Sequence, residues 1–142
     1  DPLRIQGLIF IHPGFFRGKI RTQEELDCPQ DEFMTWEMAD VCIQLTLPPG
    51  CPVDTNPYFN PIPAISGSGA KFKFPPKSLV ALADHDALHF FVLDYIKALR
   101  DAGHHVEEII SHGVGHVFFI NQPESEQTHT LKNTIVKFIK QQ

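Results

Sequence analysis

The apolar residues of the chain include three short runs that are typical of buried strands. Residues 3–11 are rich in β-branched and aromatic side chains, and His12-Pro13-Gly14 ends this run. Residues 78–83 form a shorter apolar run, and residues 106–111 form a third. Because the first run becomes continuous towards its end, we predict a strand that is buried on both faces there.

Helix signals follow the first run. Thr22 precedes Glu25 at the spacing of a capping box, so a short helix is expected after Thr22. Residues 33–47 carry apolar side chains without a clean polar face, which indicates a helix that is buried on more than one side. Pro48-Pro49-Gly50 ends this helix.

Two later segments have the spacing of amphipathic helices. Residues 91–102 carry apolar side chains four positions apart, and Gly103 lies where a C-terminal glycine belongs. Residues 125–142 show a similar pattern. The positions expected to point inward are Phe91, Tyr95 and Leu99 on the first helix, and Leu131, Ile135, Phe138 and Ile139 on the second.

The remaining long segment, residues 48–76, holds most of the twelve prolines of the chain. It also contains apolar residues that can anchor it, among them Tyr58, Phe59, Ile62 and Ile65, so we expect an ordered loop rather than a disordered linker.

The predicted elements run strand, helices, strand, helix, strand, helix. Strands that alternate with helices specify a parallel sheet with helices on both faces, the α/β class. Ligands of such sheets bind beyond the carboxyl ends of the strands. The length of 142 residues and the 42% apolar content suit one globular, soluble domain.

Charge and cysteine content exclude several function classes. The net charge of −5 and the scattered Lys and Arg residues argue against nucleic acid or an anionic membrane as partner. No apolar run reaches the ~18 residues of a membrane span, and the first residues do not show the basic and apolar pattern of a secretory leader. The odd set Cys28, Cys42 and Cys51 contains no CxxC pair, which favours a reducing compartment, the cytoplasm.

A metal site is an alternative because the chain has eight histidines. His105, His112 and His116 are the nearest set, but their spacing matches neither HExxH nor a zinc-finger pattern. We therefore expect no metal.

Chemistry is indicated at the ends of the second and third strands. His116 lies on a glycine-flanked turn followed by aromatic residues, which suits a general base that is shielded from water. Asp86 follows the second strand and could orient the histidine ring, with Asp84 as the competing acid. The pair is two thirds of a hydrolase triad. Alone, Asp86 could be a helix cap and His116 a structural histidine.

The third member of such a triad is a nucleophile, which precedes the acid in the α/β-hydrolase order. The nearest candidate, Ser66-Gly67-Ser68-Gly69, lacks the GxSxG spacing. We interpret residues 1–142 as a partial domain, the C-terminal half of an enzyme whose nucleophile-bearing half is absent.

The order of several motifs resembles the plant carboxylesterases, which belong to the hormone-sensitive-lipase-like branch of the α/β-hydrolases. The resemblance covers nearly the whole chain and depends on that order rather than on any single motif. The segments are residues 3–13, 47–50, 56–61, 74–76, 86–88 and 113–119.

This resemblance implies an esterase that needs no cofactor. It places Asp86 and His116 at the DxLxD and GxxHxF positions, as triad acid and base, and it implies an upstream HGGG oxyanion loop and GxSxG serine. The chain departs from DxLxD at Phe90, which replaces the second aspartate, and at His89, which replaces the arginine before it. The same branch contains gibberellin receptors, which lack a working histidine, and dehydratase-like or cyclase-like members with an altered nucleophile.

The resemblance also implies a pocket for a small hydrophobic ester. Apolar side chains on the predicted helix at 33–47 and beside the histidine would line it, although plain core packing explains them equally well. The oligomeric state is left open. The implied pocket residues are Phe33, Met34, Met38, Cys42, Val117 and Phe119.

Overall fold

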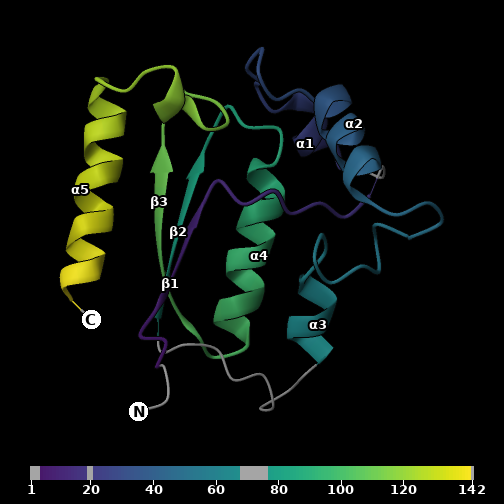
Figure 1. The fold of residues 1–142 in the computed structure, drawn as a ribbon, viewed down its shortest axis with the longest axis horizontal. Helices are drawn as coiled ribbons and strands as arrows, with labels where there is room; N and C mark the ends of the chain where they lie inside the picture. Colours follow the sequence, from purple (N-terminus) through teal and green to yellow (C-terminus); the bar gives the residue numbers. More distant parts are fainter. Residues whose placement is uncertain (1–3, 19–20, 68–76, 142) are drawn as a thin grey trace.

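Three parallel strands form the centre of the molecule. The computed structural model describes residues 4–18, 21–67 and 77–141, and in them β1 pairs with β2 and β2 pairs with β3 (Figure 1). Leu8 lies opposite Ser78, which lies opposite Val106, so the carboxyl ends meet at one edge of the sheet. The predicted α/β fold is confirmed. The strands are β1 (Leu8–Ile11), β2 (Lys77–Ala83) and β3 (His105–Ser111).

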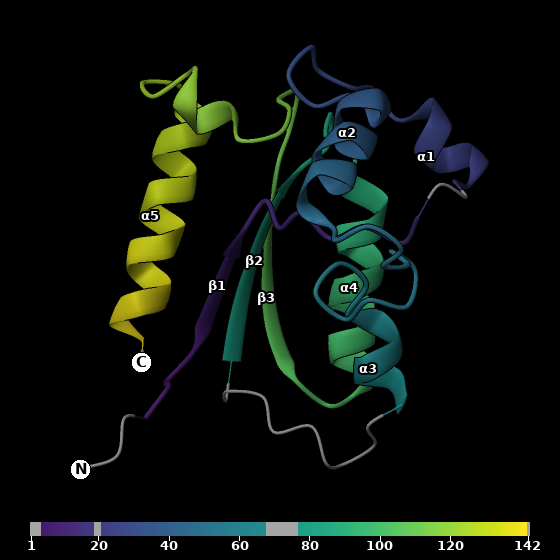
Figure 2. The same ribbon diagram turned by 45° about the vertical axis from the view of Figure 1, so that its right-hand side comes forward.

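Helices cover both faces of the sheet. The last helix, α5, packs on one face, whereas α4 packs on the other with α1, α2 and α3 on its side of the molecule (Figure 1, Figure 2). A 3-10 turn, η2 (Phe118–Ile120), precedes α5. The helices are α1 (Gln23–Asp27), α2 (Trp36–Thr46), α3 (Ile62–Gly67), α4 (His89–Asp101) and α5 (Glu126–Lys140).

Side-chain caps explain where several helices begin. The hydroxyl of Thr22 accepts from the Glu25 backbone N–H while the Glu25 carboxylate accepts from the Thr22 N–H, which confirms the predicted capping box. Thr35 caps α2 and Ser125 caps α5 through the side-chain oxygen alone, which accepts from the Met38 and the Thr128 backbone N–H respectively. At the end of α4, Gly103 has a φ of +85°, a conformation that favours glycine.

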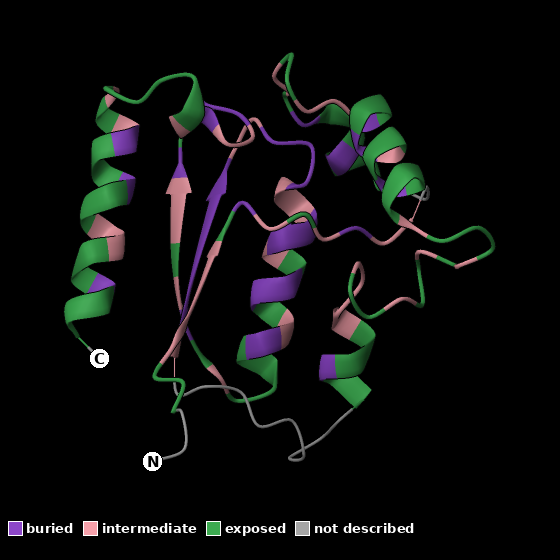
Figure 3. Ribbon diagram, viewed as in Figure 1, coloured by how far each residue is buried: buried purple, intermediate pink, exposed green. Residues whose placement is uncertain are grey.

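The central strand β2 separates two hydrophobic clusters because its side chains alternate between the faces of the sheet. Val80 and Leu82 pack into the larger cluster, beneath α4. Ala81 and Ala83 pack into the smaller cluster, beneath α5. All four residues are at most 1% exposed, and Figure 3 shows the buried surface concentrated on β2 and on the inner face of α4.

The first strand is shorter than predicted. Residues 4–7 are extended outside any strand, and Leu3 lies outside the described residues. Ile5 is 57% exposed, which shows that an apolar sequence alone does not place residues 4–7 in the sheet. Parallel pairing with β2 begins at Leu8, opposite Ser78.

The prediction that the helix at 33–47 is buried on more than one side is wrong for this chain. Only Trp36, Ala39 and Ile43 are buried, at the spacing of a single stripe, because α2 meets the core on one side. Leu45 is 81% exposed, and Met38 and Val41 are exposed as well.

The inward stripe of α5 is also narrower than predicted. Leu131 and Phe138 are buried and Ile135 is half-buried, whereas Ile139 is 54% exposed. Ile139 lies at the margin of the stripe, because its position is turned by roughly 80° from Leu131 around a helix of 3.6 residues per turn.

The proline-rich segment is ordered where the structure describes it. Phe59 and Ile62 pack against the larger cluster, and Ile65 is 2% exposed within it. Helix α3 interrupts the predicted loop, and Tyr58 is 87% exposed rather than an anchor. Residues 68–76 lie outside the described part of the chain. Among the described residues, no helix is long and apolar enough to cross a membrane.

We predict that the isolated chain self-associates through β1. Within the described residues this strand pairs only with β2, and its free edge exposes backbone donors and acceptors beside Ile11, which is 41% exposed. Sedimentation velocity is expected to show oligomers that Ile11→Lys reduces.

The matched control is Leu45→Lys on the exposed face of α2, which is expected to leave the association unchanged. A monodisperse wild-type monomer with slow amide exchange along residues 5–11 would show that the β1 edge is not a site of association.

Candidate active site

The loops after β2 and β3 are held together by backbone hydrogen bonds that continue the strand pairing. The Asp84 N–H donates to the Ser111 carbonyl at 3.1 Å, and the His85 N–H donates to the Val114 carbonyl at 3.1 Å. These bonds bring the loop that carries Asp86 against the loop that carries His116.

Asp86 and His116 form the predicted pair. The Nδ1 atom of His116 lies 2.6 Å from Oδ2 of Asp86, a short hydrogen bond within the reach expected of a histidine and its orienting acid. Because a carboxylate can only accept, His116 Nδ1 carries the proton and its Nε2 is left as an acceptor. The Asp86 side chain is 3% exposed and that of His116 is 11% exposed, so the bond is shielded from water.

The second oxygen of Asp86 is fixed as well. Oδ1 accepts from the Leu88 N–H at 2.9 Å. With one oxygen on the backbone and the other on His116, the carboxylate has one orientation, which is what a triad acid requires.

Asp84 points elsewhere, as predicted. Its Oδ2 accepts from His112 Nδ1 at 2.9 Å and its Oδ1 from the Gly113 N–H at 2.8 Å. Burial works to raise the pKa of Asp84, but these two hydrogen bonds, together with the charges of His85 and His112, hold the pKa below its usual value. Asp84 therefore stays ionised and secures the turn that leads to His116.

Asp31 packs against the same turn at Gly115, a contact that the sequence reasoning missed. Its Oδ1 accepts from the backbone N–H groups of Phe33, at 3.1 Å, and Met34, at 2.8 Å. A Cβ atom added at Gly115 would lie 1.7 Å from Asp31 Oδ2. Only glycine fits at position 115, and that absence of a side chain is the one sequence signal of this contact.

The thiol of Cys28 lies beneath the aspartate loop. Its Sγ is 3.4 Å from the Asp84 carbonyl and 3.6 Å from the Asp86 carbonyl. Burial, and next the nearby Asp86 charge, raise the pKa of the Cys28 thiol, so it remains protonated and able to donate. Cys28, Cys42 and Cys51 are all free.

His12, at the end of β1, is the second residue that the sequence reasoning missed. Its Nδ1 accepts from the Val117 N–H at 3.0 Å and lies 3.7 Å from Asp86 Oδ2. Burial lowers the pKa of His12 to about 4; the Asp86 charge opposes this effect and His116 adds to it. The buried ring is therefore neutral near pH 7.

Within the described residues, one group of three side chains has the spacing of a metal site: His12, Asp86 and His116 offer ligand atoms that all lie within 4.8 Å of one another. His105 and His112 do not belong to it. The Nδ1 atoms of His12 and His116 are already used in hydrogen bonds to Val117 and Asp86. The contacts thus match a hydrogen-bonded cluster of side chains.

His116 forms part of the wall of an apolar cavity of about 170 Å³. Two of the predicted pocket residues, Met34 and Cys42, line this cavity. Phe33 and Met38 do not line it and are 52% and 47% exposed. The full lining is Gly14, Phe16, Met34, Ala39, Cys42, Ile43, Thr46, Phe59, Leu88 and His116.

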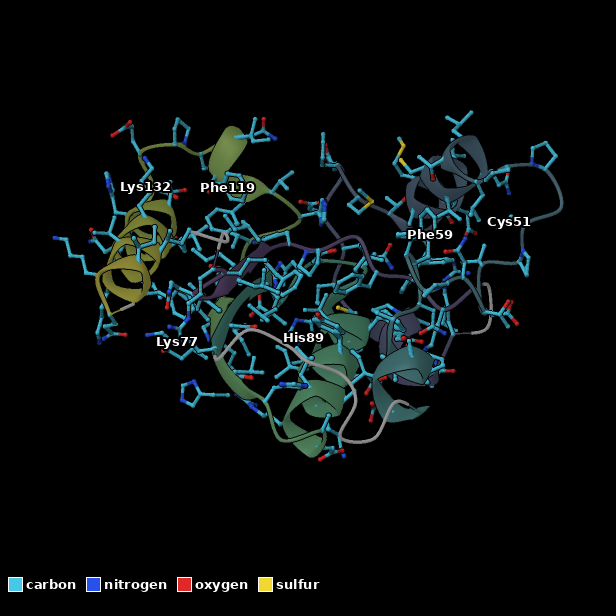
Figure 4. The ribbon with its side chains drawn as sticks, turned by 60° about the horizontal axis from the view of Figure 1, so that its bottom comes forward. Cys51, Phe59, Lys77, His89, Phe119 and Lys132 are labelled. Atoms are coloured by element: carbon cyan, nitrogen blue, oxygen red, sulfur yellow. The ribbon has the colours of Figure 1, made fainter. Side chains whose placement is uncertain are left out.

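The remaining two predicted pocket residues lie next to His12 instead. The ring of Phe119 meets the His12 ring edge-on at 5.6 Å, and the Val117 backbone binds His12. Figure 4 shows Phe119 towards the α5 side of the molecule, well apart from Phe59 on the α2 side. The cavity and the aromatic cover of His12 are therefore distinct regions.

Gly115→Ala is expected to destabilise the fold by about 1–3 kcal/mol, because the added methyl group overlaps the Asp31 side chain. Urea unfolding of the chain measures this change. The control is Gly67→Ala, where nothing lies within 4 Å of the added atom. Equal stability of the two variants would mean that Asp31 moves aside without loss.

The pKa of His12 predicts a dependence of stability on pH. Between its unfolded value of 6.5 and its folded value of about 4, only the unfolded chain binds this proton. The free energy of unfolding therefore falls as the pH falls through that window, by about 3 kcal/mol in total. Urea unfolding at several pH values is expected to show a flatter dependence for His12→Asn, and identical dependences would refute the assignment.

Comparison with known proteins gives a family and a fold. A family profile described as the alpha/beta hydrolase fold matches residues 1–120. A hyperthermophilic esterase from the archaeon Pyrobaculum calidifontis superposes with a TM-score of 0.76 at 22% identity, over 96% of this chain and 43% of that protein. A search of curated protein sequences found no significant match.

Two bacterial proteins give similar superpositions. A thermostable esterase from Pseudomonas putida ECU1011 has a TM-score of 0.72 at 18% identity, over 92% of this chain and 40% of that protein. The Francisella virulence factor BioJ has a TM-score of 0.70 at 18% identity, over 96% of this chain and 44% of its own. The chain spans less than half of each structure. Since the family profile covers most of its residues, the chain belongs to the alpha/beta hydrolase family.

Proposed function

We propose that this chain is the C-terminal part of a serine carboxylesterase, with Asp86 as the acid and His116 as the general base. The observation that carries the proposal is the 2.6 Å hydrogen bond between them at the carboxyl edge of the sheet, with His116 on the wall of an apolar cavity. The serine and the oxyanion donors would come from sequence outside these 142 residues.

In this mechanism the free Nε2 of His116 removes the proton from the serine hydroxyl as its oxygen attacks the ester carbonyl. The imidazolium then donates that proton to the departing alcohol, which leaves an acyl-enzyme. A water molecule then gives a proton to the same nitrogen as its oxygen attacks the acyl carbon. The imidazolium returns that proton to the serine oxygen when the acyl–serine bond breaks and the carboxylic acid is released. Asp86 keeps Nδ1 protonated and stabilises the positive ring at each step.

The cavity suggests the substrate class. Its lining is almost entirely apolar and includes Met34, Cys42 and Leu88 together with His116. A volume of about 170 Å³ suits a short acyl or alcohol group. We therefore propose small hydrophobic esters as substrates, without a cofactor. A pocket role for Phe33, Met38, Val117 and Phe119 would need contacts from the absent part.

Two of the structural neighbours are esterases by name, which supports this reading although their identity to the chain is low. The gibberellin-receptor alternative does not require the bond between Asp86 and His116, so its presence favours a hydrolase. A dehydratase would differ at the nucleophile. The proposal extends to a plant-type carboxylesterase in the cytoplasm, where free cysteines such as the buried Cys28 stay reduced.

The isolated chain is expected to show no turnover of a nitrophenyl butyrate, because it supplies neither a nucleophile nor oxyanion donors. The longer parent protein is expected to hydrolyse this ester. In the parent, Asp86→Asn is expected to lower kcat by about 10⁴-fold and His116→Ala by about 10⁶-fold.

The matched control in the parent is His105→Ala, an exposed histidine on β3 that is expected to leave kcat unchanged. Hydrolysis by the isolated chain that depends on His116, or full activity of His116→Ala in the parent, would overturn the proposed function.

A further inference from the structure

His12 is a buried histidine for which the esterase mechanism gives no role. Its side chain is fully buried, yet its Nε2 atom has no hydrogen-bond partner within the described part of the chain. Buried polar atoms without a partner are rare in folded proteins and call for an explanation. The other ring nitrogen, Nδ1, accepts the N–H of Val117, a residue 105 positions away.

The backbone is unusual at both ends of this hydrogen bond. His12 has a φ of +46° and Val117 has a φ of +48°, the left-handed region. A β-branched residue such as valine rarely adopts this conformation, so the surrounding structure must hold it there. The hydrogen bond from the Val117 N–H to His12 is a specific contact that does so, directly after His116.

The acceptor role of Nδ1 fixes the tautomer of the ring. Because Nδ1 accepts from Val117, the proton of the neutral ring is on Nε2, among aromatic rings. The rings of His116, Phe118 and Phe119 lie between 5.6 and 5.7 Å from that of His12. This neutral tautomer offers no proton to Asp86 Oδ2, 3.7 Å away, so that oxygen is left to His116.

We propose that His12 is a positioning residue for the Asp86–His116 pair. Its Nδ1 anchors Val117 in the left-handed conformation, and so holds the His116 ring in the direction of Asp86. The fixed tautomer meanwhile prevents His12 from competing for the carboxylate. The catalytic consequence rests on the proposed esterase function, whereas the positioning itself can be tested in the chain alone.

The chain offers two contrasting substitutions. His12→Asn keeps an acceptor oxygen close to the position of Nδ1, and asparagine tolerates a positive φ. His12→Leu fills a similar volume without an acceptor. If the acceptor matters, asparagine should keep the signals that leucine loses. Because leucine also tolerates the +46° φ of His12 less well than asparagine, His12→Gly, which adopts that φ freely and has no side-chain acceptor, is the control for backbone strain.

Nuclear magnetic resonance of the isotope-labelled chain distinguishes these cases. In His12→Leu, we expect the Val117 amide to exchange at least tenfold faster and the downfield Nδ1 proton of His116 to broaden or disappear. His12→Asn is expected to restore both signals towards wild type. Unchanged protection along β2 shows that each variant is folded. A folded His12→Leu chain with both signals unchanged would overturn the proposal.

A measurement on the wild type keeps the proposal testable if His12→Leu does not fold. A nitrogen–nitrogen coupling across the hydrogen bond is expected between the Val117 amide and His12 Nδ1, with the proton of His12 on Nε2. A His12 ring that carries its proton on Nδ1 would overturn the proposal.

Kinetics of the longer parent separate this proposal from the proposed function. His12→Leu is expected to lower kcat at least tenfold with little change in KM, and His12→Asn to recover most of the loss. If the parent hydrolyses no ester while the resonance results hold, the esterase function fails and the positioning stands. If the parent is active and His12→Leu retains the full kcat, the catalytic consequence of the positioning is refuted.

Discussion

The site depends on hydrogen bonds that extend the parallel pairing of β2 and β3 beyond the ends of the strands. Through them the Asp84 and His85 backbone joins the chain at Ser111 and Val114 before either loop turns away. The Asp84 carboxylate then binds Gly113 and His112, which closes the second loop onto the first. Asp86 and His116 lie in these two joined loops, beyond the carboxyl ends of β2 and β3. Their 2.6 Å bond follows from the sheet register rather than from either loop alone.

A buried carboxylate such as Asp86 is unfavourable unless its oxygens are satisfied, and here each oxygen has a different type of partner. The Leu88 N–H satisfies one and the His116 ring the other. His12 lies close to the same carboxylate, but burial keeps its ring neutral, with its pKa lowered to about 4. Two histidines therefore lie beside the Asp86 carboxylate. His12 is neutral and does not bind it, and His116 is hydrogen-bonded to it.

Much of this arrangement could be predicted from the sequence because strand ends are marked by composition. The apolar runs at β2 and β3 stop at Asp84 and at His112, and parallel strands place such ends at one edge. The contacts of Asp31 with Gly115 and of His12 with Val117 could not be predicted, since each joins residues that are distant in the sequence and neither Asp31 nor His12 belongs to a periodic pattern. The exposed face of α2 was misjudged for another reason: apolar periodicity does not say which faces a neighbour covers.

One residue both binds the Asp86 carboxylate and lines the apolar cavity, so the orientation of Asp86 and the shape of the cavity are linked. Leu88 donates its backbone N–H to Asp86 and contributes to the cavity wall beside His116. Leu88 also precedes α4. On this helix Tyr95 and Leu99 belong to the larger core cluster, and Phe91 is buried as well. A shift of α4 would therefore move the cavity wall and the carboxylate together. In this chain the geometry of the pair and the shape of the apolar cavity are consequences of the same packing.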